Sequence, residues 1–450
     1  EVYAISALSL VLMLVSIMRW MHAPHQSRFI WWAAFWLGIC FTNHQTLLVA
    51  VIGLQVAVLA RDAKLGRDVF FGNVVIFVLA GLALLVRYGG VQGIANSGLN
   101  IAYIKSFVVI GLASTVVTIA LFMHTGGKLG TEWWAALGML GAFVLGAGFY
   151  LYMPLAGMTI PPMQWGYPRT IEGFMHALTR GQYEKGNPTS GLDRFFGQIQ
   201  TYVDGSIEEM NIVYLAIGLI PLAVIFYRRI EPEEKVWLGA ISGIYGFFCL
   251  LKLAMKFEEY RPVVPGMIYG YVFLLIGIIP FLFFRHAGGR PERAWLAGLT
   301  TVFLFLSLML IYLLNPPPDR QSQQLNKVFF TASYVPISML VGYGLAMLAA
   351  AAAANYALFR WVLLTGSALA GAVAWYAPSI NELQYPLVVF TTQFGIGLAG
   401  AFIALFLIAR TRLPMTLLLA LYCVLPAHTF LSHWAENEQR GHLFGFWFGH

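Results

Sequence analysis

The sequence predicts an all-α polytopic membrane protein with about 13 to 14 transmembrane or half-membrane helices. Of its 450 residues, 59% are hydrophobic and only 10% are charged, whereas soluble domains are about a quarter charged. Many apolar runs approach ~20 residues, the length that a helix needs to cross about 30 Å of hydrocarbon. No segment has the period-two alternation of a membrane β-barrel. These observations favour a helical bundle in a membrane.

Each predicted span is an apolar run between charged or Pro- and Gly-containing segments, with boundaries good to a few residues. No internal repeat is visible. In chain order, the predicted spans are Val2–Arg19, Phe29–Phe41, Leu47–Ala60, Val69–Val86, Phe107–Met123, Trp133–Tyr152, Ile212–Tyr227, Val236–Leu253, Met267–Phe284, Ala294–Leu314, Phe329–Ala350, Trp361–Tyr376, Leu387–Ala409 and Met415–Leu431.

The distribution of basic residues predicts which loops face the cytoplasm. The loops at 228–235, 285–293 and 410–414 are short and basic, and such loops stay inside. The longer loops, including 87–106 and 158–211, then face outside. The net charge of +7 is therefore a topology signal and not a sign of nucleic-acid binding. The outer face then carries nearly all of the long loops.

Two consecutive spans, Phe29–Phe41 and Leu47–Ala60, are too short for a full crossing. Thirteen residues cover about 20 Å of helix. The polar turn between them, Thr42 to Gln45, would then lie below the outer surface. Polar backbone at that depth is tolerated only inside protein or beside a wet cavity. The sequence thus predicts a recessed outer pocket.

These features divide the chain into four predicted parts. Residues 1–157 form an N-terminal transmembrane bundle with the short hairpin 29–60, and 158–211 form an extracytoplasmic loop region. Residues 212–431 form a C-terminal bundle, and 432–450 an extracytoplasmic tail. The three cysteines lie inside apolar runs, which favours small buried hydrophobes over disulfides or a metal site.

Several polar groups are predicted to converge on the outer face. Arg suits phosphate, because its planar fork binds two oxygens at once, and Trp and Tyr suit sugar faces or the headgroup zone. A carboxylate near such a site could act as a general base or hold a divalent cation. The candidates are Glu1, Asn43, His44, Trp165, Arg180, Tyr183, Arg261 and Arg320.

Each candidate also has a purely structural interpretation. Trp165 and Tyr183 are also suited to anchoring the chain at the membrane interface, and a loop Arg can face lipid phosphate. His44 either lines the pocket or is a buried, hydrogen-bonded histidine. No P-loop, dinucleotide-binding or zinc-protease motif occurs, so no predicted mechanism depends on ATP or catalytic zinc.

Several segments resemble one bacterial family. Glu1-Val2-Tyr3 resembles its helix start, and Gly38 through Asn43-His44 its Gly-Asn-His turn. The stretch YLYMP at 150–154, continued by PPMQWGYPRT at 161–170 and RGQY at 180–183, is similar to its most specific segment. The tail NEQRG at 437–441 resembles a motif that usually carries an acid, but Gln439 stands at that position. This departure argues against a metal or acid role for the tail.

The family is a group of polytopic proteins long labelled a domain of unknown function. It is related to protein O-mannosyltransferases and belongs to the GT-C superfamily of membrane glycosyltransferases. The resemblance implies a GT-C-like fold and an inverting transfer of sugar from a polyprenyl-phosphate donor to a protein or glycan acceptor. It also implies an integral protein of the bacterial inner membrane whose active face is extracytoplasmic. It also implies that the catalytic carboxylate lies upstream of residue 1, so we expect a fragment that keeps Glu1 as a secondary base or orienting group.

The predicted function is therefore membrane glycosyl transfer. Arg180, Arg261 or Arg320 would neutralise the donor phosphate, Asn43 and His44 would hold the sugar or a water, and Trp165 would stack on donor or acceptor. Two alternatives remain, a flippase for lipid-linked sugars and a non-catalytic membrane scaffold. Membrane lipids are expected partners in all three cases.

Overall fold

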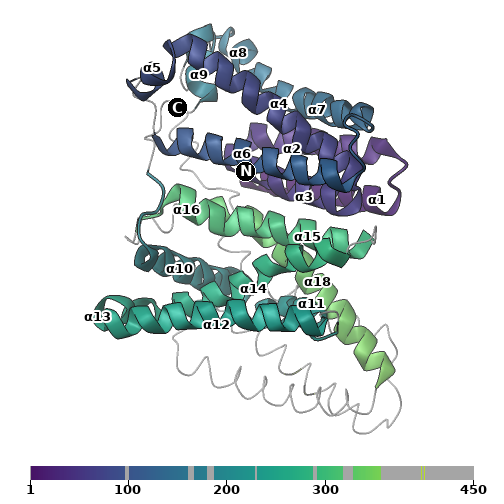
Figure 1. The fold of residues 1–450 in the computed structure, drawn as a ribbon, viewed down its shortest axis with the longest axis vertical. Coiled ribbons are helices and arrows are strands. Elements are labelled where there is room, and N and C mark those ends of the chain that lie inside the picture. The colour runs from purple at the N-terminus through teal and green to yellow at the C-terminus, as the bar shows by residue number, and fades with distance from the viewer. Residues whose placement is uncertain are drawn as a thin grey trace. The chain divides into compact units, whose positions relative to one another are not determined.

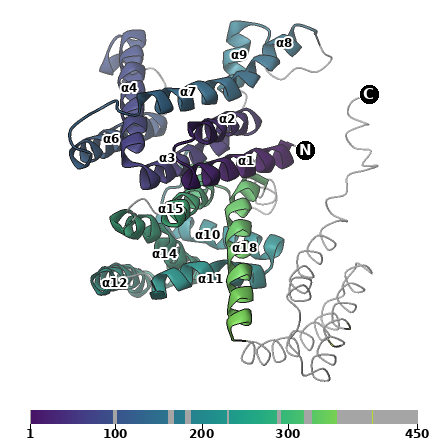
Figure 2. The same ribbon diagram turned by 90° about the vertical axis from the view of Figure 1, so that its right-hand side faces the viewer.

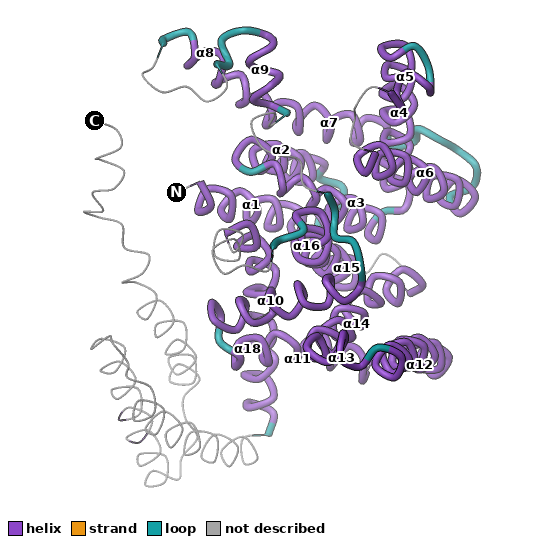
Figure 3. Tube along the Cα trace, turned by 90° about the vertical axis from the view of Figure 1, so that its left-hand side faces the viewer, coloured by secondary structure: helices purple, strands orange, loops and turns teal. Residues whose placement is uncertain are grey.

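The structure is a computed structural model, and it describes residues 2–96, 101–160, 167–179, 187–228, 231–286, 291–317, 328–355, 397 and 400. The described residues form helices and loops and no strand (Figure 3). Eight helices in these ranges are long and apolar enough to cross a membrane. The prediction of an all-α polytopic membrane protein is therefore confirmed.

The helices follow one another closely along the chain. The π-helical turn is η4, and the other η elements are 3₁₀ turns. The elements are α1 (Val2–His22), α2 (Ser27–Asn43), η1 (Gln45–Val49), α3 (Ala50–Arg61), α4 (Ala63–Tyr88), α5 (Val91–Asn96), α6 (Ile101–His124), α7 (Trp133–Ala147), η2 (Gly148–Leu151), α8 (Tyr152–Gly157), α9 (Ile171–Leu178), α10 (Leu192–Met210), α11 (Ile212–Arg228), α12 (Pro232–Met255), α13 (Phe257–Tyr260), η3 (Arg261–Val263), α14 (Val264–His286), α15 (Pro291–Leu304), η4 (Phe305–Met309), α16 (Leu310–Leu314), η5 (Val328–Phe330) and α18 (Thr331–Ala354).

Two compact units are present. Unit 1 contains residues 1–209 and 224–339, and unit 2 contains residues 210–223 and 340–450. In unit 2, Gly344 of α18 lies against Ile217 of α11, where a Cβ would be 2.8 Å from the Ile217 Cγ2. The predicted spans from Trp361 onward lie outside the described residues. The division predicted at residues 157, 211 and 431 stays a prediction.

In unit 1, α15 is the central helix. Figures 1 and 2 both show it between α3 and α14, and it packs against both. The contact with α3 depends on glycine: a Cβ on Gly53 would lie 2.7 Å from the Val302 backbone nitrogen, and one on Gly298 would lie 3.2 Å from the Ala57 Cα. Small residues let membrane helices approach closely, which strengthens their packing.

A buried ion pair fixes the start of α4 to the loop before α7. The Arg67 Nε donates to Asp68 at 2.8 Å, and its two terminal nitrogens donate to the Thr125 and Thr131 hydroxyls, each at 2.8 Å. The carboxylate of Asp68 also accepts from the backbone nitrogens of Gly130 and Glu132. Both side chains are buried. A buried pair is tolerated only when its hydrogen bonds are satisfied in this way.

The hairpin predicted at 29–60 has longer arms than expected. The first arm, α2, has 17 residues instead of 13, and η1 with α3 covers Gln45–Arg61. Seventeen residues of α-helix extend about 25 Å, which still falls short of a full crossing. The first arm is longer than predicted because Ser27 and Thr42 are part of the helix although neither is apolar.

The predicted loop 158–211 contains two helices, α9 and α10. In α10 the buried residues Phe196, Ile199, Tyr202 and Ser206 recur at helical spacing, while Arg194, Asp204 and Glu208 are exposed. The charges interrupt the apolar run, so an amphipathic helix was missed by the search for continuous apolar spans. The helices α5, α9 and α13 all lie in predicted outer loops, and in Figure 1 all three lie on the left-hand side of unit 1, with α5 and α9 at the top and α13 near the bottom.

Candidate functional site

The polar turn of the hairpin is buried and held by hydrogen bonds. His44 is 7% exposed; its Nδ1 is hydrogen-bonded to the Thr46 hydroxyl, and its ring centroid lies 5.1 Å from that of Phe329. The Gln45 Nε2 donates to the Tyr150 hydroxyl at 3.0 Å and to the Leu178 carbonyl at 2.6 Å. Of the two interpretations of His44, the structure supports the buried, hydrogen-bonded histidine.

Asn43, next to His44, differs from its neighbours. Its Nδ2 is buried, and it has no hydrogen-bond partner in the described part of the chain. An unpaired buried donor costs about 1–3 kcal/mol. Such an atom can be satisfied by an oxygen of a water or a bound polar ligand. Asn43 therefore stays a candidate for ligand binding.

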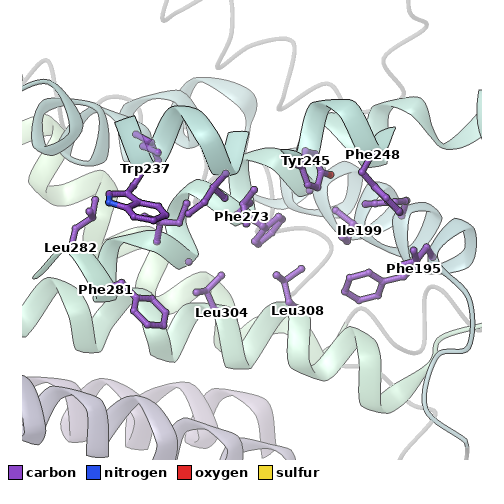
Figure 4. A pocket seen from close by; sticks show the side chains of 18 of the residues that line it. Phe195, Ile199, Trp237, Tyr245, Phe248, Phe273, Phe281, Leu282, Leu304 and Leu308 are labelled. Carbon is purple, nitrogen blue, oxygen red and sulfur yellow. The ribbon is translucent and has the colours of Figure 1, made fainter. Parts of the chain in front are cut away.

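A long apolar groove runs along one side of unit 1, with a volume of about 870 Å³. Figure 4 shows Trp237, Phe281 and Leu282 at one end of it and Phe195 and Phe248 at the other. Apart from Glu234, the Tyr245 hydroxyl and the indole nitrogen of Trp237, its lining carries no polar side-chain group. Its walls come from α10, α12, α14, α15 and η4, and include Phe196, Ile199, Ile241, Phe273, Leu274, Gly277, Ile278, Leu304 and Leu308.

The groove follows one face of α12. Trp237, Ile241, Tyr245 and Phe248 recur at intervals of four or three residues and all line it. From Trp237 to Phe248 the helix rises about 16 Å. α12 is also one of the helices able to cross a membrane. A groove of this length and apolar composition is suited to one lipid chain.

Lys252 marks the end of the groove next to Phe248. It lies one turn further along the same face of α12, and its Nζ is 5.8 Å from the ring centroid of Phe248 and 5.9 Å from that of Tyr260. Lys252 has no carboxylate partner among the described residues. A half-buried ammonium held by two rings and lacking an acidic partner can bind an anion.

The neighbouring cations are less suitable. The Lys256 Nζ is 2.6 Å from the Glu259 carboxylate, whose hydrogen bond and charge raise the pKa of Lys256, so this ammonium is already paired. Arg261, a predicted phosphate ligand, is exposed and lies 5.9 Å from the Phe257 ring, which does not line the groove. Of Lys252, Lys256 and Arg261, only Lys252 both lacks a carboxylate partner among the described residues and lies over a ring that lines the groove.

Aromatic contacts connect the polar turn with the groove. Phe329 packs on His44, and its neighbour Phe330 packs on Tyr202 at 5.3 Å between centroids. Tyr202 in turn lies 6.1 Å from Phe273, which lines the groove. The hydroxyl of Tyr202 is fixed by Ser333 at 2.7 Å. The two features thus lie in one packed body.

The predicted site is only partly within the described residues. Asn43 and His44 are in the polar turn, and Arg261 is apart from them on η3. Glu1, Trp165, Arg180, Tyr183 and Arg320 lie outside the described residues. Sequence reasoning did not identify the groove or select Lys252. The signal was available in the stripe formed by Trp237, Ile241, Tyr245, Phe248 and Lys252.

No group of three or more His, Cys, Asp or Glu residues within the described ranges could hold a metal ion. Comparison of the chain with protein-family models, with curated proteins and with solved structures found no match. A functional proposal therefore depends on the groove, on Lys252 and on the polar turn.

Proposed function

We propose that this protein is a GT-C-type membrane glycosyltransferase that moves a sugar from a polyprenyl-phosphate donor to an acceptor outside the cytoplasm. The observation that carries the proposal is the apolar groove of about 870 Å³ with an unpaired ammonium at its end. A lipid-linked sugar phosphate combines the same two chemistries, a long apolar chain and an anionic head. The bacterial inner membrane is the proposed location.

In this mechanism the donor chain occupies the groove and its phosphate pairs with Lys252. The acceptor hydroxyl loses its proton to a carboxylate and attacks the anomeric carbon, while the bond from that carbon to the phosphate oxygen breaks. Inversion follows because attack and departure occur on opposite faces. Lys252 stabilises the negative charge on the leaving phosphate. Glu1 would assist as a secondary base, and Trp165 would stack on a sugar.

The polar turn is assigned to the sugar. The buried Nδ2 of Asn43 would donate to a sugar hydroxyl or to a water that bridges to it. His44 would hold the turn in place through Thr46, so its role is positioning. Arg180 and Arg320 remain proposed phosphate ligands alongside Lys252.

Two other functions use the same groove. A flippase would move the donor without chemistry, and a scaffold would bind lipid without moving it. The buried ion pair of Arg67 and Asp68 does not favour a transport relay, because its hydrogen bonds fix the loop before α7. The placement of α5, α9 and α13 on the same side of unit 1 in Figure 1 favours chemistry on one face.

The test is an assay of the full-length protein with labelled polyprenyl-phosphate mannose and an acceptor peptide. Transfer of label supports the enzyme, movement of donor between leaflets without transfer supports the flippase, and neither supports the scaffold. In the enzyme, Lys252→Gln should raise the donor KM about 10-fold to 100-fold, because a hydrogen bond to a charged group contributes about 1.5–3 kcal/mol.

The matched control is Lys256→Gln, which removes a nearby ammonium already paired with Glu259. Its KM should stay within about twofold of the parent, since exposed ion pairs contribute little. Lys252→Arg keeps the charge and should restore most of the affinity. Equal effects of Lys252→Gln and Lys256→Gln would contradict the role of Lys252. Wild-type transfer by the Arg180→Ala, Arg261→Ala and Arg320→Ala variants would exclude all three as phosphate ligands.

A further inference from the structure

A cluster of basic side chains lies at the turn between α1 and α2. Arg19 and His22 lie in the last turn of α1, His25 lies in the connection to α2, and Arg28 lies in the first turn of α2. All four side chains are exposed. The segment from Val2 to Arg61 contains no Asp or Glu. The cluster therefore has no acidic partner from its own helices.

Both arginines of the cluster are held by one aromatic ring. The Cζ atoms of Arg19 and Arg28 each lie 4.9 Å from the centroid of Phe29. The two guanidinium groups are therefore within twice that distance of each other. Arg28 is also oriented by the Gln26 side chain, which accepts a hydrogen bond from it at 2.7 Å. Neither forms an ion pair in the described ranges.

The neighbouring element adds charge of the same sign. Arg61 at the end of α3 donates from Nε to the Met21 carbonyl at 2.7 Å, which places the start of α4 beside the turn. Lys64 is exposed there. Asp62 caps α4 at this junction, where its carboxylate accepts from the backbone nitrogens of Lys64 and Leu65. It does not pair with Arg19 or Arg28.

The surroundings place the cluster where a membrane ends. His22 is the last residue of the candidate span Ala4–His22. Trp32, one helical turn after Arg28, is 52% exposed, so an apolar surface continues from the cations into the hydrocarbon zone. Cations above an exposed aromatic residue match a phospholipid, whose phosphate lies above its acyl chains. A free phosphate ion would use only the cations.

We propose that the α1–α2 turn binds the phosphodiester headgroup of an anionic phospholipid through Arg19 and Arg28. The two guanidinium groups donate to the phosphate oxygens in forked geometry. Trp32 lies against the upper acyl chain. This site is separate from the donor groove and does not depend on the proposed glycosyl transfer.

Native mass spectrometry of the purified protein, titrated with phosphatidylglycerol or phosphatidylcholine, tests the proposal. The parent should prefer phosphatidylglycerol. Arg19→Gln and Arg28→Gln should each weaken its binding about fivefold, since one basic side chain near a membrane surface contributes about 1 kcal/mol to anionic lipid binding. Arg19→Lys and Arg28→Lys keep the charge and should lose less, which separates charge from misfolding.

The matched control is Arg87→Gln. Arg87 is also an exposed arginine at the end of a span, with its Cζ 5.6 Å from the ring of Tyr88. Its loss should leave phosphatidylglycerol binding unchanged, and an equal loss in this variant would overturn the proposal. Displacement of the lipid by glycerol phosphate at millimolar concentration would also overturn it, because the site would then recognise a free anion.

Discussion

Helices α15 and α12 have similar apolar sequences but opposite roles in unit 1. Both are candidate spans, yet 61% of the α15 window is buried and none of the α12 window is. α15 meets α3 through Gly53 and Gly298, with backbones in contact. α12 instead presents Trp237, Tyr245 and Phe248 to a groove that the protein leaves unfilled. Hydropathy alone does not distinguish a helix that builds the core from one that lines an open groove.

The comparison predicts that substitutions will separate into two classes. Changes in the closely packed region should reduce the free energy of unfolding, because its contacts are already made within the protein. Changes in the groove should alter lipid binding and leave stability nearly unchanged, because the missing contacts are supplied by a ligand. The predictions below run from the largest expected effect to the smallest.

Replacing Arg67 should have the largest effect on stability. Arg67→Met leaves the buried Asp68 carboxylate without its cation and should reduce the free energy of unfolding by about 3–5 kcal/mol. Denaturant titration of the protein in bicelles measures this. Arg87→Met, which alters an exposed arginine, is the control and should change stability little. The double variant Arg67→Met/Asp68→Asn should recover part of the loss; no loss in the single variant would contradict the buried pair.

Glycine substitutions test the packing directly. A Cβ on Gly53 would overlap Val302, so Gly53→Ala should cost about 1–3 kcal/mol of stability. A Cβ on Gly243 of α12 meets nothing within 4 Å. Gly243→Ala should therefore be neutral, or stabilising by up to about 1 kcal/mol through helix propensity. The same denaturant titration compares the two variants. A similar loss of stability in both would contradict the proposed difference in packing between α15 and α12.

Asn43 should combine a small stability effect with a loss of function. Asn43→Leu removes a buried donor that has no partner in the described residues, so the free energy of unfolding should stay the same or rise by up to about 1–3 kcal/mol while sugar transfer falls. Gln198→Leu is the contrast, since that amide donates to Asn315 and Pro316 and should cost about 1–3 kcal/mol. A large loss of stability in Asn43→Leu would show that its Nδ2 is satisfied in the folded protein.

Much of the fold could be predicted from the sequence because a membrane imposes length and polarity on each span. The runs beginning near Val69, Trp133 and Val236 correspond to α4, α7 and α12. The short hairpin was also identifiable, since a polar turn such as Thr42 to Gln45 cannot lie in lipid. The helix α10 was not predicted, because its exposed charged residues interrupt the apolar pattern and make the segment resemble a loop.

The site was less predictable for a physical reason. The polar turn can be located from the cost of burying His44, but its hydrogen bonds to Tyr150 and Leu178 join segments over a hundred residues apart. Residues of α10, α12, α14 and α15 line the groove. The sequence of any one of these helices does not indicate that a space remains between them. Lys252 becomes a candidate anion ligand only because its Nζ lies close to the Phe248 ring in the folded protein.

The central claim is that the groove along α12 holds the chain of a lipid-phosphate donor. Photolabelling with a polyprenyl-phosphate analogue that carries a photoreactive group in its chain, followed by peptide mapping, tests it most directly. Gly277→Phe fills the groove, since a Cβ there meets only Leu304 at 3.8 Å, whereas Gly243→Phe points a ring away from it. We predict label on α12 and α14 between Trp237 and Leu282, lost in Gly277→Phe and retained in Gly243→Phe. Label found only on elements that do not line the groove, or label unchanged in Gly277→Phe, would contradict the account.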